Sequence, residues 1–241
     1  QEVGIYSIAA KVYSLVKQLL NAITVVTIPR FSFLLSKDDY IAFNKLGNSI
    51  IDVLILFLLP LNIGLLFEGG HLLYVFAGEE YVSGTLALQL LSASLFFAVG
   101  GCFLVSSILI PLKQERKVLA ATSVAAVINI ILNLLIIPVF GMDGAAFSTI
   151  IAELFNFSIC VVFAKKHFKL RMNMRNLVTV GAGSVIVLLA CYGVNYFVPS
   201  PLMALIASLC ISIILYFAVL LIGHNEYVLS TAERIKSLLF R

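Results

Sequence analysis

The sequence predicts an all-α membrane protein, a polytopic bundle of transmembrane helices, and three observations support this. Of the 241 residues, 61% are hydrophobic and only 12% are charged, whereas a typical globular domain has about 25% charged residues. Several apolar stretches are long enough to cross a bilayer. The connections between them are basic and non-basic in turn. A water-soluble core of this size could not bury so much apolar surface.

Seven stretches predict membrane spans, because about 20 apolar residues cross a hydrocarbon core about 30 Å thick. They cover roughly 4–28, 50–67, 84–110, 118–138, 144–164, 177–198 and 202–222. The polar part of the first connection, 37–49, is expected to form a short amphipathic helix on the membrane surface. The second connection, 68–83, carries Glu68 and His71. Pro138, Gly141 and Gly144 predict a tight hairpin between the fourth and fifth spans.

The basic residues predict the orientation of the spans. All but two of the 16 lysines and arginines lie in the first, third and fifth connections or in the tail, and the other connections have none. By the positive-inside rule, the basic connections and the C-terminus are cytoplasmic. The sequence then starts on the outer side without a methionine. We therefore expect the C-terminal part of a longer protein, preceded by an odd number of helices.

The two exceptions, Lys11 and Lys17, lie inside the first span. Lys17 is beside a stripe of polar side chains that recur at spacings of three and four residues: Ser7, Lys11, Ser14, Gln18 and Asn21. Such a stripe should face protein or water rather than lipid. Two interpretations stay open at this point: a polar, cation-lined cavity, or structural pairing of the lysines with an acid on another span.

Further polar residues lie in the fourth and fifth spans. Asn129 and Asn133 are one helical turn apart, and Asn156 shares a face of the next span with Glu153. Amides within membranes commonly connect helices, so the three asparagines are expected to be polar packing residues. Glu153 has three possible roles: a partner for a lysine, a proton or cation site, or an acceptor at a helix end.

Several function classes lack support in the sequence. The four cysteines and three histidines are dispersed without metal-ligand spacing, and neither a metal site nor another cofactor is expected. No phosphate-binding GxxxxGK[ST], GxSxG or HExxH motif occurs, so no enzyme is expected. The basic segment 165–175 is expected to contact anionic membrane lipids rather than nucleic acid.

Specific segments resemble the Wzx-type polysaccharide flippases, which export O-antigen and capsule repeat units. They belong to the superfamily that includes the multidrug and toxin extrusion transporters. The segments are EVGIYSIAAKV (2–12), IPRFS (28–32), GEEYVSGTLALQLLS (78–92), LIPLKQERK (109–117) and INIILNLLIIPVFGMDGAAFSTIIAE (128–153). The resemblance covers most of residues 2–165; the last two spans match only the usual extra C-terminal pair.

The resemblance implies a two-lobed bundle of 12 to 14 helices. Residues 1–164 would form five spans of the second lobe, lacking its first helix. A basic cytoplasmic loop (165–176), a C-terminal helix pair (177–222) and a cytoplasmic tail (223–241) would follow. The missing N-terminal lobe of the same protein would then be one of the chain's partners, together with membrane lipids and the lipid-linked oligosaccharide.

The resemblance also implies a function. It predicts a transporter of the bacterial inner membrane that flips undecaprenyl-pyrophosphate-linked oligosaccharides outward by alternating access and is coupled to an ion gradient. The oligosaccharides would be O-antigen, capsule or exopolysaccharide repeat units. Polysaccharide polymerases and assembly proteins are further expected partners. The expected substrate-binding residues are Lys11, Ser14, Lys17, Gln18, Asn21 and Arg30, with Glu153 as the coupling residue. The alternatives are a lipid II flippase, a drug or cation antiporter of the same fold, and a non-transporting membrane scaffold.

Overall fold

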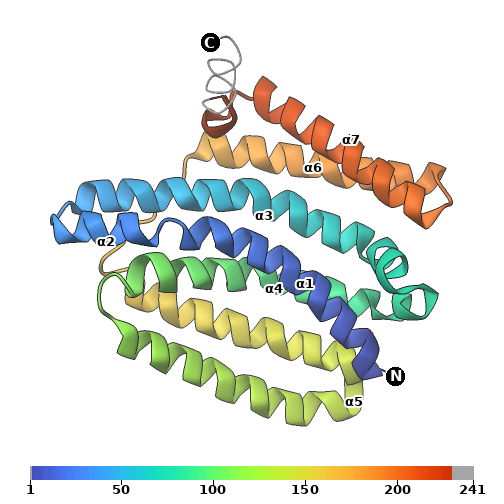
Figure 1. Cartoon of the computed structure of the whole chain (residues 1–241), viewed down its shortest axis with the longest axis horizontal. Coiled ribbons are helices and arrows are strands. Elements are labelled where there is room, and N and C mark those ends of the chain that lie inside the picture. The colour runs from blue at the N-terminus through green and yellow to red at the C-terminus, as the bar shows by residue number, and fades with distance from the viewer. Residues whose placement is uncertain (1, 230–241) are drawn as a thin grey trace.

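Helices make up the regular structure of residues 2–229, the part of the chain that the computed structural model describes, and no strand occurs there (Figure 1). In chain order the elements are α1 (Glu2–Val25), α2 (Ile28–Ser36), α3 (Tyr40–Ala77), the 3₁₀-helix η1 (Glu79–Gly84), α4 (Thr85–Phe103), the π-helical turn η2 (Leu104–Leu109), α5 (Glu115–Ala164), α6 (Met174–Phe197) and α7 (Pro201–Ile222).

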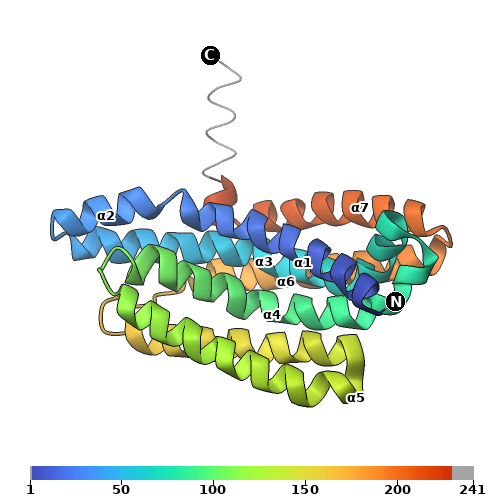
Figure 2. The same ribbon diagram turned by 60° about the horizontal axis from the view of Figure 1, so that its bottom comes forward.

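Six helical stretches of the described residues are long and apolar enough to span a membrane. The longest of them, the 50-residue α5, bends back on itself and forms two arms, 115–140 and 142–164. The two arms run side by side, with the second arm next to α4 (Figures 1 and 2). Counting each arm as one crossing, the seven predicted spans are present, and the predicted all-α polytopic bundle is confirmed.

The turn of α5 depends on Gly141. Its φ of 55° and ψ of −132° lie outside the helical region, in a conformation that residues with a Cβ rarely adopt. The arms also approach closely beyond the turn, since a Cβ added at Gly144 would lie 2.8 Å from Ile136 Cγ2. The hairpin predicted from Pro138, Gly141 and Gly144 is therefore confirmed.

Two predicted boundaries were wrong. No separate surface helix covers 37–49: the Asp39 side chain accepts a hydrogen bond from Ala42 N and caps α3, which then continues through the second span. The separate short helix is instead α2, which begins next to Pro29. At the other end, α3 continues to Ala77, so Glu68 is a buried helical residue rather than part of a connection. Residues 230–241 of the predicted cytoplasmic tail lie outside the described residues.

The buried side chains form two apolar clusters. The larger one joins α1, α3, α4 and the second arm of α5, and it includes Leu20, Leu88 and Ile108. The smaller one joins the α6–α7 pair to α3 and includes Val187 and Leu220. Large apolar side chains are also exposed over most helices, as expected for surfaces that contact lipid.

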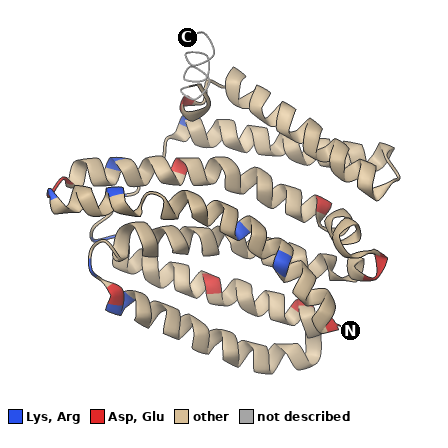
Figure 3. Ribbon diagram, viewed as in Figure 1, with Lys and Arg blue, Asp and Glu red and all other residues tan. Residues whose placement is uncertain are grey.

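The two ends of the bundle differ in charge (Figure 3). The basic end carries the α2–α3, α4–α5 and α5–α6 connections, and lysines and arginines gather there. The opposite, acidic end carries Glu2, η1 and the turn of α5, and within the described residues its connections contain no lysine or arginine. The charge alternation along the sequence thus becomes a charge separation between the two ends of the molecule.

Candidate functional site: the polar face of α1

The first helix has two faces of different chemistry. Its buried residues pack against α3 and α4: Ile5, Ala9, Val12, Tyr13, Leu20 and Thr24. Apart from Tyr13 and Thr24 these residues are aliphatic, and all lie within one sector of the helix. This face fixes α1 in the bundle and directs the remaining side chains away from the packed core.

The polar stripe of α1 lies on the other face. Lys11 and Gln18 are exposed, while Ser14 and Asn21 are half-buried. The Oδ1 atom of Asn21 is buried without a hydrogen-bond partner among the described residues. A lysine at the centre of a membrane helix costs about 2.5–3.5 kcal/mol on insertion scales. The stripe therefore requires water, a polar ligand or further protein beside it.

Lys17 lies at the edge of this stripe and forms an ion pair with α5. Its Nζ atom lies 2.7 Å from Glu153 Oε1, and the two side chains are 28% and 20% exposed. The same Nζ is 5.7 Å from the centre of the Tyr13 ring, within range of a cation–π interaction. The Tyr13 hydroxyl is in turn 3.1 Å from Ser94 Oγ on α4. Lys17 thus connects three elements: α1, α4 and the second arm of α5.

The two lysines therefore have different environments. Lys17 has the acidic partner that one interpretation of the sequence required, and this partner is Glu153. Among residues 2–229, no carboxylate oxygen lies within 4 Å of the Lys11 ammonium. Lys11 is exposed and, among the described residues, is the lysine of the stripe without a carboxylate partner.

Arg30 is separated from the stripe by the turn between α1 and α2. It is exposed on α2, where the chain has passed Thr27 and entered a second short helix. It belongs to the basic end of the molecule rather than to the middle of α1. The structure thus groups Lys11, Ser14, Gln18 and Asn21 on one face but places Arg30 apart from them.

The three asparagines have local partners. Asn133 Nδ2 donates to Asn129 Oδ1 at 3.0 Å, so these two side chains pair along the first arm of α5. Asn156 accepts a weak hydrogen bond from Cys160 Sγ at 3.9 Å on its own helix. It also packs across to α4, because a Cβ added at Gly101 would lie 3.6 Å from Asn156 Nδ2.

The sequence did not predict a contact between a buried carboxylate and a histidine on α3. Glu68 is only 2% exposed, and its Oε2 atom lies 2.9 Å from Nδ1 of His71 one turn later on α3. The spacing of three residues was visible in the sequence, but it had meaning only if the helix continued past the predicted end of the span. The pair lies toward the acidic end, away from the basic connections.

Comparison with known proteins places this geometry in a family. The family model "Lipid II flippase MurJ" matches residues 2–221. A solved structure described as "Lipid II flippase MurJ, inward closed conformation" superposes with a TM-score of 0.79 at 18% sequence identity. The match covers 94% of this chain and 48% of the solved one, so the chain spans about half the length of the protein it resembles. The search of curated proteins found no match.

The matched family is not the one whose motifs the sequence resembles. Both the family model and the solved structure carry the name of a flippase for lipid II, a peptidoglycan precursor. The solved structure shares the helical fold of this chain. Because the family model extends over nearly the whole described chain, the protein belongs to the MurJ lipid II flippase family.

Proposed function

We propose that the full-length protein moves a polyprenyl-pyrophosphate-linked peptidoglycan precursor, lipid II, across the bacterial inner membrane. The observation that carries this proposal is the family match over residues 2–221. It favours lipid II over the O-antigen, capsule and exopolysaccharide units expected from the sequence motifs. The basic end is proposed to be cytoplasmic, because positively charged connections are retained on that side.

The polar face of α1 supports the proposal chemically. A pyrophosphate that enters a low-dielectric cavity needs cations to replace its hydration. Lys11 offers such a cation, and the hydroxyl and amide groups of Ser14, Gln18 and Asn21 suit a saccharide. We propose that this face lines the pathway toward a second lobe supplied by the rest of the protein, with Arg30 at its cytoplasmic mouth.

Glu153 and Lys17 are proposed to respond to the state of the pathway. While they are paired, their charges offset each other. An approaching pyrophosphate would compete with Glu153 for Lys17, and a released carboxylate could take up a proton or cation. In this proposal Glu153→Gln reduces the dependence of transport on the ion gradient while leaving Lys11 available to the substrate.

The test uses the full-length protein in cells depleted of their own lipid II flippase. We expect it to restore growth and to make lipid II accessible to an added lipid II-cleaving enzyme that cannot cross the membrane. Lys11→Ala should lower this accessibility at least tenfold at unchanged protein level, whereas Lys113→Ala on the α4–α5 connection should not. Full transport by Lys11→Ala would refute the role of the α1 face.

A second candidate is export of lipid-linked polysaccharide units, favoured by the motifs of 2–12 and 128–153. Both substrates present a pyrophosphate, so α1 alone does not distinguish them. Restoration of surface polysaccharide in an exporter-deficient strain, without any lipid II transport, would support this candidate and contradict the first. A drug or cation antiporter would instead confer resistance to organic cations, and a scaffold would lose assembly but not transport.

A further inference from the structure

The segment between α5 and α6, residues 165–173, is fixed to the bundle and is called the strap: it begins with a turn at 165–167 and has no regular secondary structure from 168 to 173. Two asparagines one turn apart on α3 bind its backbone: Lys169 N donates to Asn44 Oδ1 at 2.8 Å, and Arg171 N donates to Asn48 Oδ1 at 2.5 Å. Asn48 Nδ2 also donates to Lys169 O at 3.1 Å. Phe168 is buried beside Phe103, with ring centres 6.0 Å apart. The strap is therefore a built part of the surface.

Alternate side chains of the strap line different cavities. Phe168, Leu170 and Met172 line an apolar cavity on one side. Lys169 and Arg171, which lie between them in the sequence, line a polar pocket on the other. This alternation is what an extended backbone produces, since successive side chains point to opposite sides.

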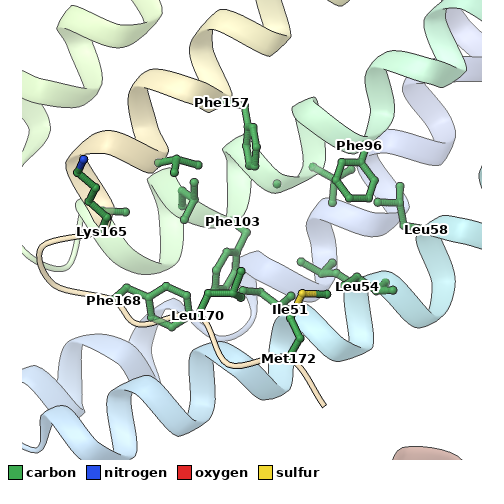
Figure 4. A pocket seen from close by; sticks show the side chains of 16 residues that line it. Ile51, Leu54, Leu58, Phe96, Phe103, Phe157, Lys165, Phe168, Leu170 and Met172 are labelled. Atoms are coloured by element: carbon green, nitrogen blue, oxygen red, sulfur yellow. The ribbon is translucent and has the colours of Figure 1, made fainter. Parts of the chain in front are cut away.

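The apolar cavity has a volume of about 420 Å³ and lies between α3, α4, the second arm of α5 and the strap (Figure 4). Phe96, Phe103 and Phe157 contribute its aromatic walls. Among the residues that the structure describes, Lys165 is the only charged one that lines it. Val161 and Leu170 on its lining are exposed, so the cavity opens to the surface of the protein. Its size is within the range of about 300–1,000 Å³ that small-molecule sites occupy.

The neighbouring polar pocket is strongly basic. It has a volume of about 690 Å³, and its four cationic lining residues are Lys45, Lys166, Lys169 and Arg171. Its one carboxylate, Asp52, accepts a hydrogen bond from the Tyr227 hydroxyl at 3.2 Å. Within residues 2–229, no carboxylate oxygen lies within 4 Å of these four cations. The pocket therefore has positive charge that an external anion can balance.

We propose that the strap and its two cavities form a binding site for an anionic phospholipid of the leaflet at the basic end, with an acyl chain in the apolar cavity and the phosphate on the cations of the strap. The charge complementarity and the adjacent apolar cavity fit an amphiphile with one negative head and a hydrocarbon chain. No residue of α1 lines either cavity, so this site is distinct from the proposed transport pathway.

The test measures lipid binding to the detergent-solubilised full-length protein by native mass spectrometry. Phosphatidylglycerol is compared with phosphatidylcholine of the same chain length. The strap variant carries Lys165→Gln, Lys169→Gln and Arg171→Gln. We expect it to lose phosphatidylglycerol affinity by about 10- to 100-fold, since each basic residue near an anionic lipid contributes about 1 kcal/mol. Phosphatidylcholine binding should be weak and unchanged.

A matched control removes the same charge at the same end without touching the site: Lys113→Gln, Arg116→Gln and Lys117→Gln on the α4–α5 connection. It should change phosphatidylglycerol affinity less than threefold. Equal losses in the two triple variants would overturn the proposal, because they would show only a general surface attraction.

The apolar half of the site has its own variant pair. Val161→Trp fills the cavity while retaining every strap cation, and it should lower phosphatidylglycerol affinity several-fold; Val162→Trp, which does not line the cavity, should not. An ineffective Val161→Trp would contradict acyl-chain binding. Competition by soluble glycerol phosphate would indicate a free-anion site instead, and competition by lipid II would assign the site to the transported substrate. Either result overturns the proposal, whereas failure of lipid II transport leaves it unaffected.

Discussion

Lys17 and Glu153 show how a membrane helix accommodates a charge near its middle. The two groups are 2.7 Å apart and about three-quarters covered, so two opposite charges lie together where lipid or protein replaces water. Lys11 has no such partner among the described residues. Two lysines six residues apart on one helix therefore have different consequences for stability and for ligand binding.

A double-mutant cycle tests the Lys17–Glu153 pair. Lys17→Ala and Glu153→Ala should each destabilise the full-length protein, because each leaves one half-buried charge unpaired, and the double variant should recover part of the loss. We expect a coupling energy of about 1–2 kcal/mol, less than for a fully buried pair. Thermal unfolding in detergent measures it. Lys11→Ala is the control and should cost little stability; additivity of the two single losses would contradict the pairing.

A residue outside the membrane-spanning helices shows a related effect of burial. Burial raises the pKa of the Tyr227 phenol above its usual value, so its hydroxyl stays protonated at neutral pH. It can therefore donate its hydrogen bond to Asp52 of α3 at 3.2 Å throughout the physiological range. This contact fixes the beginning of the chain beyond α7 against the basic end of the bundle.

The arms of α5 illustrate how one residue divides an element. Both arms are apolar and helical, and only the conformation of Gly141 reverses the chain between them. At position 141 the backbone φ is positive, a conformation that residues with a Cβ rarely adopt. An added Cβ would also lie 2.7 Å from Glu2 Oε2. The Glu2 side chain is exposed and can move aside, so the positive φ is the main reason that this position favours glycine.

Gly141→Ala should therefore destabilise the full-length protein by about 1–3 kcal/mol. The matched control is Gly181→Ala in α6, where a Cβ would meet nothing within 4 Å; the helix propensity of alanine should make that change neutral or stabilising by up to about 1 kcal/mol. Unfolding temperatures of the two variants provide the comparison. Equal effects would show that the turn tolerates a side chain.

The strap gives a second prediction at the scale of one element. Asn44→Ala combined with Asn48→Ala removes the acceptors of the Lys169 and Arg171 amides. Loss of a hydrogen bond of typical strength should make these amides exchange with deuterium about 2- to 10-fold faster. Asn173→Ala, which removes only the cap of the Arg175 amide at the start of α6, should leave both rates unchanged. Unaltered exchange in the double variant would refute the anchoring role of the asparagines.

The whole molecule combines an apolar surface with two ends of different charge. Exposed leucines, isoleucines and phenylalanines cover its sides, while lysines and arginines gather at one end. In a membrane this distribution fixes the depth of the bundle along the membrane normal and favours one orientation. The polar stripe of α1 is the exception, and in our proposal it faces the lobe that this half-length chain does not contain.

Cysteine labelling of the full-length protein tests the orientation. In a cysteine-free background, Lys37→Cys, Lys113→Cys and Lys169→Cys should react with a membrane-impermeant maleimide only after the cytoplasmic side is opened. Glu80→Cys in η1 should react in intact cells with a permeable outer membrane. The physical reason is the retention of basic connections on the cytoplasmic side. The reverse pattern would invert the proposed direction of transport.

Much of the fold was predictable because the hydrophobicity of each segment and the charge of each connection are local properties of the sequence. The length of each apolar stretch gave the seven crossings, and the basic connections predicted which of them share an end. Boundaries were less predictable: the polar residues before the second span looked like a surface helix, yet Asp39 caps a helix that continues through the membrane. Likewise, the acid at position 68 marked an expected loop, although His71 pairs with it inside α3.

The amino-acid order determines the fold class, the number of membrane crossings and the distribution of charge between the two ends. These properties depend on the transfer of each segment between water and lipid. The partner of each polar side chain does not, because partners come from segments far apart in sequence. Glu153 is 136 residues from Lys17, and Lys169 is 125 residues from Asn44. The polar stripe on α1 could be predicted from residue spacing alone. Only the packing of α1 against α4 and α5 determined that Lys17, and not Lys11, pairs with a carboxylate among the described residues.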